Sequence, residues 1–262
     1  MLRHELDPVK NFSVGGLKVN IYTSRQVMGK AAAAAVGNKI RELLSKRQSI
    51  NMVFAAAPSQ NEFLEALCQE PSIDWSRIIA FHLDDYIGLP ENAPQKFTNY
   101  LKEHIFSKLN FGKVFLMNGN ALSPEEECRR YSKLLEKYPL DIACIGIGEN
   151  GHLAFNDPPL ADFTDSKLVK VVQLEESCRL QQVHDGCFNL LPEVPTHALT
   201  LTIPAILLAK WVYCIVPGFT KSEAVKRVIE GKISKECPAT VLKNHNQSFL
   251  FLDPDSASKL KN

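Results

Sequence analysis

IACIGIGENGHLAFNDP, at residues 142–158, is the stretch of this chain that says most about its fold. Residues 142–147 form an apolar run, which is typical of a strand whose two faces are both covered by other elements. The run ends among the glycines Gly146, Gly148 and Gly151, which let the backbone turn and approach a ligand closely. The stretch therefore predicts a buried strand with a ligand-binding turn at its carboxyl end.

Comparable strands alternate with helical patterns on both sides of this stretch. Strands are predicted at residues 17–22, 51–57, 78–83, 114–117, 211–216 and 249–252, and helices at 26–46, 60–67, 96–109, 124–136, 203–210 and 220–229. This alternation predicts an α/β fold with three α/β/α layers and a mostly parallel, Rossmann-like doubly wound sheet. Because no repeat or linker divides the chain, we expect residues 1–262 to form a single domain. The polar, irregular segment 156–194 is the candidate for an active-site flap.

Composition and charge exclude several classes of protein. The 262 residues carry 30 basic and 29 acidic side chains, so nothing favours a nucleic-acid or anionic membrane partner. The amino terminus has no signal-peptide pattern, and the longest near-apolar stretch, 203–216, is too short to span a bilayer. The cysteine count is seven, an odd number without CxxC spacing, which favours reduced thiols. We expect a cytoplasmic protein, and a homo-oligomer remains open.

The glycine-rich turn carries a histidine beside a carboxylate. His152 is followed by Asp157 five residues later, close enough in a turn for the carboxylate to orient the imidazole, and Asn150 lies between the glycines. A lone histidine is more often structural than catalytic, but this setting at a strand end favours catalysis. The spacing is GxGxxGH in mid-chain rather than a GxGxxG that opens a helix, so we expect no nicotinamide cofactor.

Adjacent carboxylates, Asp84 and Asp85, follow the apolar strand at residues 78–83. Burying two adjacent carboxylates in an apolar core is unfavourable, so at least one of them must face solvent, a ligand or a cation. Either this is a loop carboxylate that caps backbone amides, or it is a general base whose pKa is adjusted by its surroundings.

Two further strand ends have features of an anion site. Ser59 stands where the strand at 51–57 runs into a helix, whose backbone amides and dipole favour an anion, although the serine could simply be an N-cap. Lys221 lies in the first turn of another helix, where the dipole disfavours a cation. That position favours an anionic partner for the lysine.

Together these motifs resemble the glucosamine-6-phosphate deaminase (isomerase) family, part of a superfamily that includes 6-phosphogluconolactonases. FHLDDYIGLP at residues 81–90 is similar to the family's FNMDEYVGLP block, and GIGENGHLAFNDP at 146–158 to its GIGxxGHIAFNEP signature. LMNGNA at 116–121 and VPTHALT at 194–200 also resemble family motifs, so the resemblance extends over the whole chain. A lactonase would be expected to carry a GPDGHxASLFP-like block instead.

The resemblance implies catalytic roles for the matching residues. Asp84 matches the base that moves the C2 proton in aldose–ketose isomerisation, and His152 matches the residue that shuttles protons as the pyranose ring opens. Asp157 stands where the family has a glutamate that assists the histidine, and Asn150 where members have Asp or Asn. Asp157 is one methylene shorter than glutamate, so its reach must be recovered by backbone or water. No metal or other cofactor is implied.

The resemblance also implies a phosphate site. Lys221 and Arg179 match positions that bind the sugar phosphate, Arg179 through an alignment with a one-residue gap. The family's Gly/Thr/Ser-rich phosphate loop is replaced by residues 57–60 (APSQ), which lack glycine and include a proline without an N–H. The expected contacts with substrate or phosphate come from Ser59, Gln60, Asp85, Gly151, Arg179 and Lys221.

We therefore expect a hydrolase and isomerase of amino-sugar catabolism that converts glucosamine 6-phosphate and water to fructose 6-phosphate and ammonia. Its expected partner is the small-molecule sugar phosphate. The alternatives are the same chemistry on galactosamine 6-phosphate or another hexose phosphate, a 6-phosphogluconolactonase, and a non-catalytic sugar-phosphate sensor. A metal hydrolase using Asp84, Asp85 and His152 lacks recognisable ligand spacing.

Overall fold

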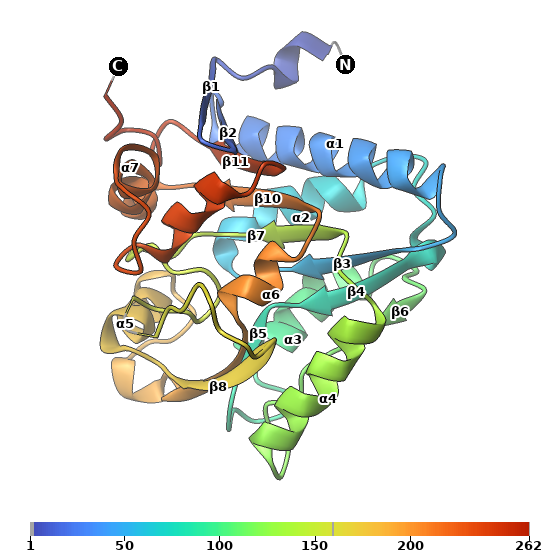
Figure 1. Ribbon diagram of the computed structural model, residues 1–262, viewed down its shortest axis with the longest axis vertical. Helices are drawn as coiled ribbons and strands as arrows, with labels where there is room; N and C mark the ends of the chain where they lie inside the picture. Colours follow the sequence, from blue (N-terminus) through green and yellow to red (C-terminus); the bar gives the residue numbers. More distant parts are fainter. Residues whose placement is uncertain (1–2, 159, 262) are drawn as a thin grey trace.

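A computed structural model describes residues 3–158 and 160–261, and its centre is an eight-stranded sheet (Figure 1). The strand order is β1-β2-β11-β10-β7-β3-β4-β6, and all neighbours except β1 and β2 pair in parallel. The strands are β1 (Lys10–Val14), β2 (Leu17–Ile21), β3 (Ile50–Phe54), β4 (Ile78–His82), β6 (Lys113–Val114), β7 (Ile142–Ile145), β10 (Trp211–Val216) and β11 (Ser248–Leu252). The predicted mostly parallel sheet is confirmed.

Helices cover both faces of this sheet, as predicted. Side chains alternate along β3, so that Met52 and Phe54 join one buried core while Val53 joins the other. The first core includes residues of α1 (Arg25–Leu44), α2 (Asn61–Cys68) and α3 (Phe97–Leu101). The second includes residues of α4 (Pro124–Lys137), α6 (Ile203–Leu207) and α7 (Ser222–Glu230). The result is the expected arrangement of three layers.

A small antiparallel sheet, absent from the sequence prediction, lies beside the main one (Figure 1). Its order is β5-β9-β8, from β5 (Asp84–Tyr86), β9 (His197–Leu201) and β8 (Val169–Gln173). Leu83 joins the two sheets, because its N–H donates to Phe54 O of β3 while its carbonyl accepts from Leu201 N of β9. Asp84 therefore stands where the chain leaves the main sheet.

Several predicted boundaries differ from the structure. The strand at 114–117 is reduced to the short β6, and the helix at 96–109 is a five-residue α3 followed by a π-helical turn, Lys102–Phe106. The segment 156–194 holds regular structure, namely β8 and α5 (Glu176–His184). All seven cysteines are free thiols. Among the described helices, none is long and apolar enough to cross a membrane.

Candidate active site

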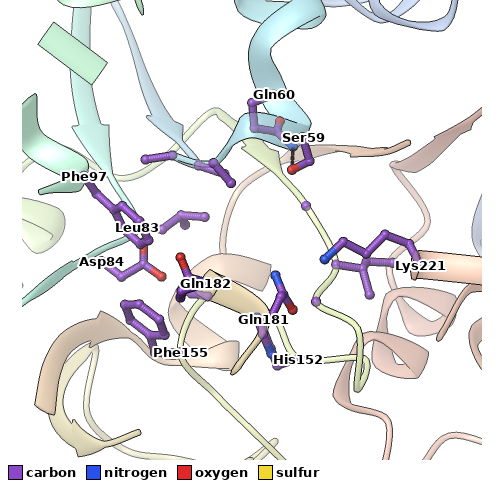
Figure 2. Close-up of a pocket in the computed structure, with 17 residues that line it drawn as sticks. Ser59, Gln60, Leu83, Asp84, Phe97, His152, Phe155, Gln181, Gln182 and Lys221 are labelled. Carbon is purple, nitrogen blue, oxygen red and sulfur yellow. Dashed lines mark hydrogen bonds between the residues drawn. The ribbon is translucent and has the colours of Figure 1, made fainter. Parts of the chain in front are cut away.

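A cavity opens at the carboxyl ends of β3, β4, β7 and β10, where the sequence predicted ligand binding (Figure 2). The chain segments that follow these strands supply most of its walls, and α3 and α5 supply the rest. The lining residues are Ala55, Ala56, Ala57, Ser59, Gln60, Leu83, Asp84, Phe97, Gly146, Ile147, Gly148, His152, Ala154, Phe155, Gln181, Gln182 and Lys221.

Asp84 presents a free carboxylate to this cavity. Its side chain is 6% exposed, and its neighbours in the wall are the apolar side chains of Leu83, Phe97 and Phe155. Burial, and then the charge of Asp85, raise the pKa of Asp84 well above its ordinary value. The described residues donate no hydrogen bond to this carboxylate. A buried carboxylate with raised proton affinity and free lone pairs has the properties of a general base.

Asp85 has the opposite environment and does not line the cavity. Its oxygens accept from the backbone N–H groups of Tyr86 at 2.9 Å, Phe97 at 3.0 Å and Thr98 at 3.2 Å, and from the Thr98 hydroxyl. The carboxylate thereby caps the first turn of α3. The predicted substrate contact of Asp85 is not supported by this position, since its hydrogen bonds hold it behind the wall. The cap interpretation fits Asp85, and Asp84 is the carboxylate that lines the cavity.

His152 is held in one orientation by its neighbours in the turn. Its Nδ1 lies 2.9 Å from Asn150 Oδ1 and 3.1 Å from Asp157 Oδ1, while Asn150 Nδ2 donates to the same Asp157 oxygen at 2.8 Å. Since both neighbours of Nδ1 are acceptors, Nδ1 carries the proton and Nε2 is left with a lone pair. The ring lines the cavity, and this lone pair can take up a proton there.

Asp157 is fully buried beneath this histidine. Burial raises the pKa of Asp157, but hydrogen bonds and charge from His152, together with the Asn150 hydrogen bond, outweigh it, and the pKa lies below its ordinary value. The carboxylate therefore stays charged next to the His152 ring. Although Asp157 does not line the cavity, it positions the residue that does.

Two glycines of the turn leave room for neighbouring side chains, Gly148 for the His152 ring and Gly151 for Cys237. A Cβ at Gly148 would lie between 2.1 and 2.4 Å from atoms of the His152 ring, so only glycine lets the ring pack against this backbone. Gly151 adopts a φ of +90°, and a Cβ there would lie 2.4 Å from Cys237 Sγ. The predicted substrate contact of Gly151 is not supported by its position, because Gly151 does not line the cavity and its backbone N–H and carbonyl bond to Gly148 O and Ala239 N.

Lys221 lies at the far end of the cavity from Asp84 (Figure 2). The side chain is 3% exposed, and its Nζ has no hydrogen-bond partner within the described part of the chain. Burial lowers the pKa of Lys221, although the nearby charges of Asp185 and Glu149 act in the opposite direction. A buried ammonium without a partner is costly, and an anion in the cavity would supply the missing hydrogen bonds.

Ser59 and Gln60 form the wall next to Lys221, on the short 3₁₀ helix Pro58–Gln60 before α2. Gln60 Nε2 donates to Ser59 Oγ at 3.2 Å and to Ile215 O at 3.1 Å, which joins this helix to β10. Ser59 is not an N-cap, since the N-cap position belongs to Ala57. The hydroxyl of Ser59 and the unpaired Oε1 of Gln60 remain as polar groups beside the lysine.

Residues 23–251 match the family profile described as glucosamine-6-phosphate isomerases/6-phosphogluconolactonase. The chain belongs to this family. It is 36% identical over 227 residues to a glucosamine-6-phosphate deaminase of Bacillus cereus (strain G9842), covering 86% of this chain and 84% of the relative. It is 37% identical over 211 residues to one of Listeria monocytogenes serotype 4a (strain HCC23), covering 80% and 88%. The resemblance found in the motifs is thus confirmed.

Solved structures of the family share the fold. A monomeric glucosamine-6-phosphate deaminase superposes with a TM-score of 0.84 at 29% identity, covering 92% of this chain and 98% of that one. A 6-phosphogluconolactonase from Thermotoga maritima superposes with a TM-score of 0.74 at 19% identity, covering 90% and 99%. The lactonase likeness is one of fold alone.

Two expectations drawn from family positions change with the geometry. Asp157 reaches His152 directly at 3.1 Å, so neither water nor a backbone group needs to replace the methylene that a glutamate would add. Arg179 lies on α5 but does not line the cavity. Its guanidinium donates to the backbone carbonyls of Leu191 and Val194, and the arginine braces the loop after the helix. Its predicted phosphate contact is not supported by this position.

The residues that sequence reasoning missed are Gln181 and Gln182, together with the aromatic wall of Phe97 and Phe155. The glutamines belong to the segment that was interpreted as a flap, and nothing in their sequence separates them from surface residues. The buried residues of α5 are Cys178 and the two glutamines, so no apolar periodicity marks the helix or the face that enters the cavity. The possible metal ligands also differ from the set Asp84, Asp85 and His152 that was considered from the sequence. Among the described residues, the ligand atoms that lie within 4.8 Å of one another are those of His152, Asp157 and Cys178.

Proposed function

We propose that this protein is a glucosamine-6-phosphate deaminase, which converts glucosamine 6-phosphate and water to fructose 6-phosphate and ammonia. The observation that carries the proposal is one cavity that holds an unbonded Asp84 carboxylate, an oriented His152 and an unpaired Lys221. Membership of the family, and relatives named for this activity, support the same reaction.

The anionic end of the substrate binds first in this account. The phosphate pairs with Lys221 Nζ and accepts from the Ser59 hydroxyl, at the end of the cavity remote from Asp84. Pairing with a dianion also favours the charged lysine, which counters the lowering of its pKa by burial. Gln60 keeps Ser59 in place through its own hydrogen bonds.

His152 opens the pyranose ring. Its Nε2 takes the proton of the anomeric hydroxyl, and a proton is returned to the ring oxygen, which yields the open-chain aldehyde. Asp157 and Asn150 fix the tautomer and the ring plane through Nδ1, so no reorientation is needed between the two transfers.

Asp84 then carries out the isomerisation. Its carboxylate takes the proton from C2 and delivers a proton to C1, while the amino group gives up a proton and O1 gains one, which converts the 2-amino aldose to a 2-imino ketose. The apolar wall of Phe97 and Phe155 keeps the proton affinity of Asp84 high enough for both steps. Water adds to C2 of the imine, and ammonia leaves to give fructose 6-phosphate.

Ammonia release from glucosamine 6-phosphate, measured together with fructose 6-phosphate, tests the proposal. Galactosamine 6-phosphate and 6-phosphogluconolactone serve as parallel substrates. We expect equimolar ammonia and fructose 6-phosphate from the first substrate, with a kcat/KM above that for the other two. Hydrolysis of the lactone alone, or binding of the sugar phosphates without turnover, would assign the cavity to another function.

A further inference from the structure

Gln181 and Gln182 are neighbours on α5 that both line the cavity and are both 6% exposed. Their hydrogen bonding differs completely. Gln181 Oε1 accepts from Glu149 N at 2.8 Å, and its Nε2 donates to Asp185 Oδ2 at 3.2 Å. The Gln182 carboxamide neither donates to nor accepts from any described residue. One glutamine thus fixes the glycine-rich turn to α5, and the other is left with unused donors and acceptors.

The free carboxamide of Gln182 is directed into the cavity. Figure 2 shows it among the side chains that surround the space, together with Asp84 and Phe155. Its amide oxygen and nitrogen make no hydrogen bond to the described residues and are not among the fully buried unpaired atoms, so they are accessible from the cavity to a ligand. The backbone of Gln182 is already part of the scaffold, since its carbonyl accepts from Cys187 N and Phe188 N. The side chain is the part without a structural partner.

We propose that Gln182 is a specificity-determining residue whose carboxamide hydrogen-bonds a hydroxyl of the bound sugar. This inference rests on the proposed function. With the phosphate at Lys221, the anomeric centre at His152 and C2 at Asp84, the sugar positions left without a protein partner are the C3 and C4 hydroxyls. A hydroxyl donates and accepts, and a carboxamide does both in return. An apolar residue at this position would leave that hydroxyl unsatisfied.

Binding measurements on deoxy sugars test this role without relying on turnover. Isothermal titration with glucose 6-phosphate, 3-deoxyglucose 6-phosphate and 4-deoxyglucose 6-phosphate gives the contribution of each hydroxyl in the native protein and in Gln182→Met, which keeps the side-chain length. We expect one of the two deoxy sugars to bind the native protein about tenfold more weakly than glucose 6-phosphate. In Gln182→Met this difference disappears, because the variant has no carboxamide to bond the hydroxyl of glucose 6-phosphate, so removing that hydroxyl costs nothing further.

Gln181→Met is the matched control, because it removes the same amide from the neighbouring position. Its hydrogen bonds are internal, so we expect a lower melting temperature and an undiminished difference between the sugars. Gln182→Met should melt at or above the temperature of the native protein. If the deoxy penalty survives in Gln182→Met, or if neither hydroxyl carries a penalty in the native protein, the proposed role of Gln182 is wrong.

The same experiment separates this inference from the proposed function. Ammonia release by the native protein is measured independently with glucosamine 6-phosphate. If the native protein binds sugar phosphates but releases no ammonia, the deaminase proposal fails while the titrations still decide the role of Gln182. If ammonia is released normally and Gln182→Met retains its kcat/KM within about twofold, the Gln182 proposal fails alone.

Discussion

Asp84 and Asp85 are consecutive in the chain but belong to two different regions, the cavity wall and the scaffold behind it. Asp84 is surrounded by apolar side chains and accepts no hydrogen bond from the described residues, so its pKa is raised. Asp85 is fully buried and accepts hydrogen bonds from three backbone N–H groups and one hydroxyl. The same side chain is thus left reactive in one region and used as a structural cap in the other.

The glutamines and the lysine extend this contrast. Gln181 is bonded into the scaffold while Gln182 faces the cavity without a partner, and Lys221 faces it as an unpaired ammonium. Each group on the wall is buried without the hydrogen bonds that would stabilise it. The wall therefore lowers the free energy of unfolding of the empty protein, and the scaffold residues behind it offset that cost. Substitutions should separate the two regions by opposite effects on activity and stability.

Asp84→Asn should give the largest effect on activity. Removing the base should lower kcat by about 10³-fold. Because the native pKa is raised, the unfolded state releases its proton at lower pH, so the native protein loses stability as the pH rises through and above the ordinary value of 3.8. Asn removes this penalty, so the melting temperature at neutral pH should stay level or rise. A marked fall in melting temperature would place Asp84 with the scaffold.

Asp157→Asn should give the second-largest effect on activity, because Asp157 orients His152 although it does not line the cavity itself. The amide can present its NH₂ to Nδ1 of His152, which would favour the tautomer that has its proton on Nε2. We expect kcat to fall about 10²-fold while KM changes little. A raised KM with an unchanged kcat would contradict this positioning role.

Lys221→Met should separate binding from stability. Loss of the charged contact should raise KM about 10- to 100-fold, and the melting temperature of the empty protein should rise because a buried unpaired charge is gone. Between the lowered pKa of Lys221 and its ordinary value of 10.5, the unfolded state binds more protons, so the stability of the empty native protein increases with pH there. Thermal scans over alkaline pH should show this increase, and Lys221→Met should lack it.

Asp85→Asn should have the smallest effect on the chemistry and the clearest effect on the fold. An amide in place of the carboxylate weakens the cap of α3 and leaves buried N–H groups poorly bonded. We expect the free energy of unfolding to fall by about 1–3 kcal/mol, measured by urea titration, with kcat within about tenfold of the native value. A stable but inactive Asp85→Asn would remove the contrast between the two carboxylates.

The sequence was sufficient for the parallel sheet and for five of the cavity residues, Asp84, His152, Lys221, Ser59 and Gln60, because each follows a strand and strand ends meet at one edge. It could not separate Asp84 from Asp85, since the difference arises when α3 folds against the second carboxylate. It also added Arg179 to the phosphate site beside Lys221, whereas tertiary packing places the glutamines of α5, and not Arg179, in the cavity wall. Contacts between segments that are distant in the chain decide which side chains face the cavity, and local sequence patterns carry no information about these contacts.

Proton exchange at the sugar carbons tests the central claim most directly, namely that Asp84 is the base that faces the reacting carbons. Glucosamine 6-phosphate is converted in D₂O by the native protein, Asp84→Asn and Asp85→Asn, and deuterium at C1 of the fructose 6-phosphate is measured by mass spectrometry. The account predicts deuterium at C1 with the native protein and Asp85→Asn, and product formation and exchange both slowed by about 10³-fold with a folded Asp84→Asn. Exchange at close to the native rate in Asp84→Asn would contradict it.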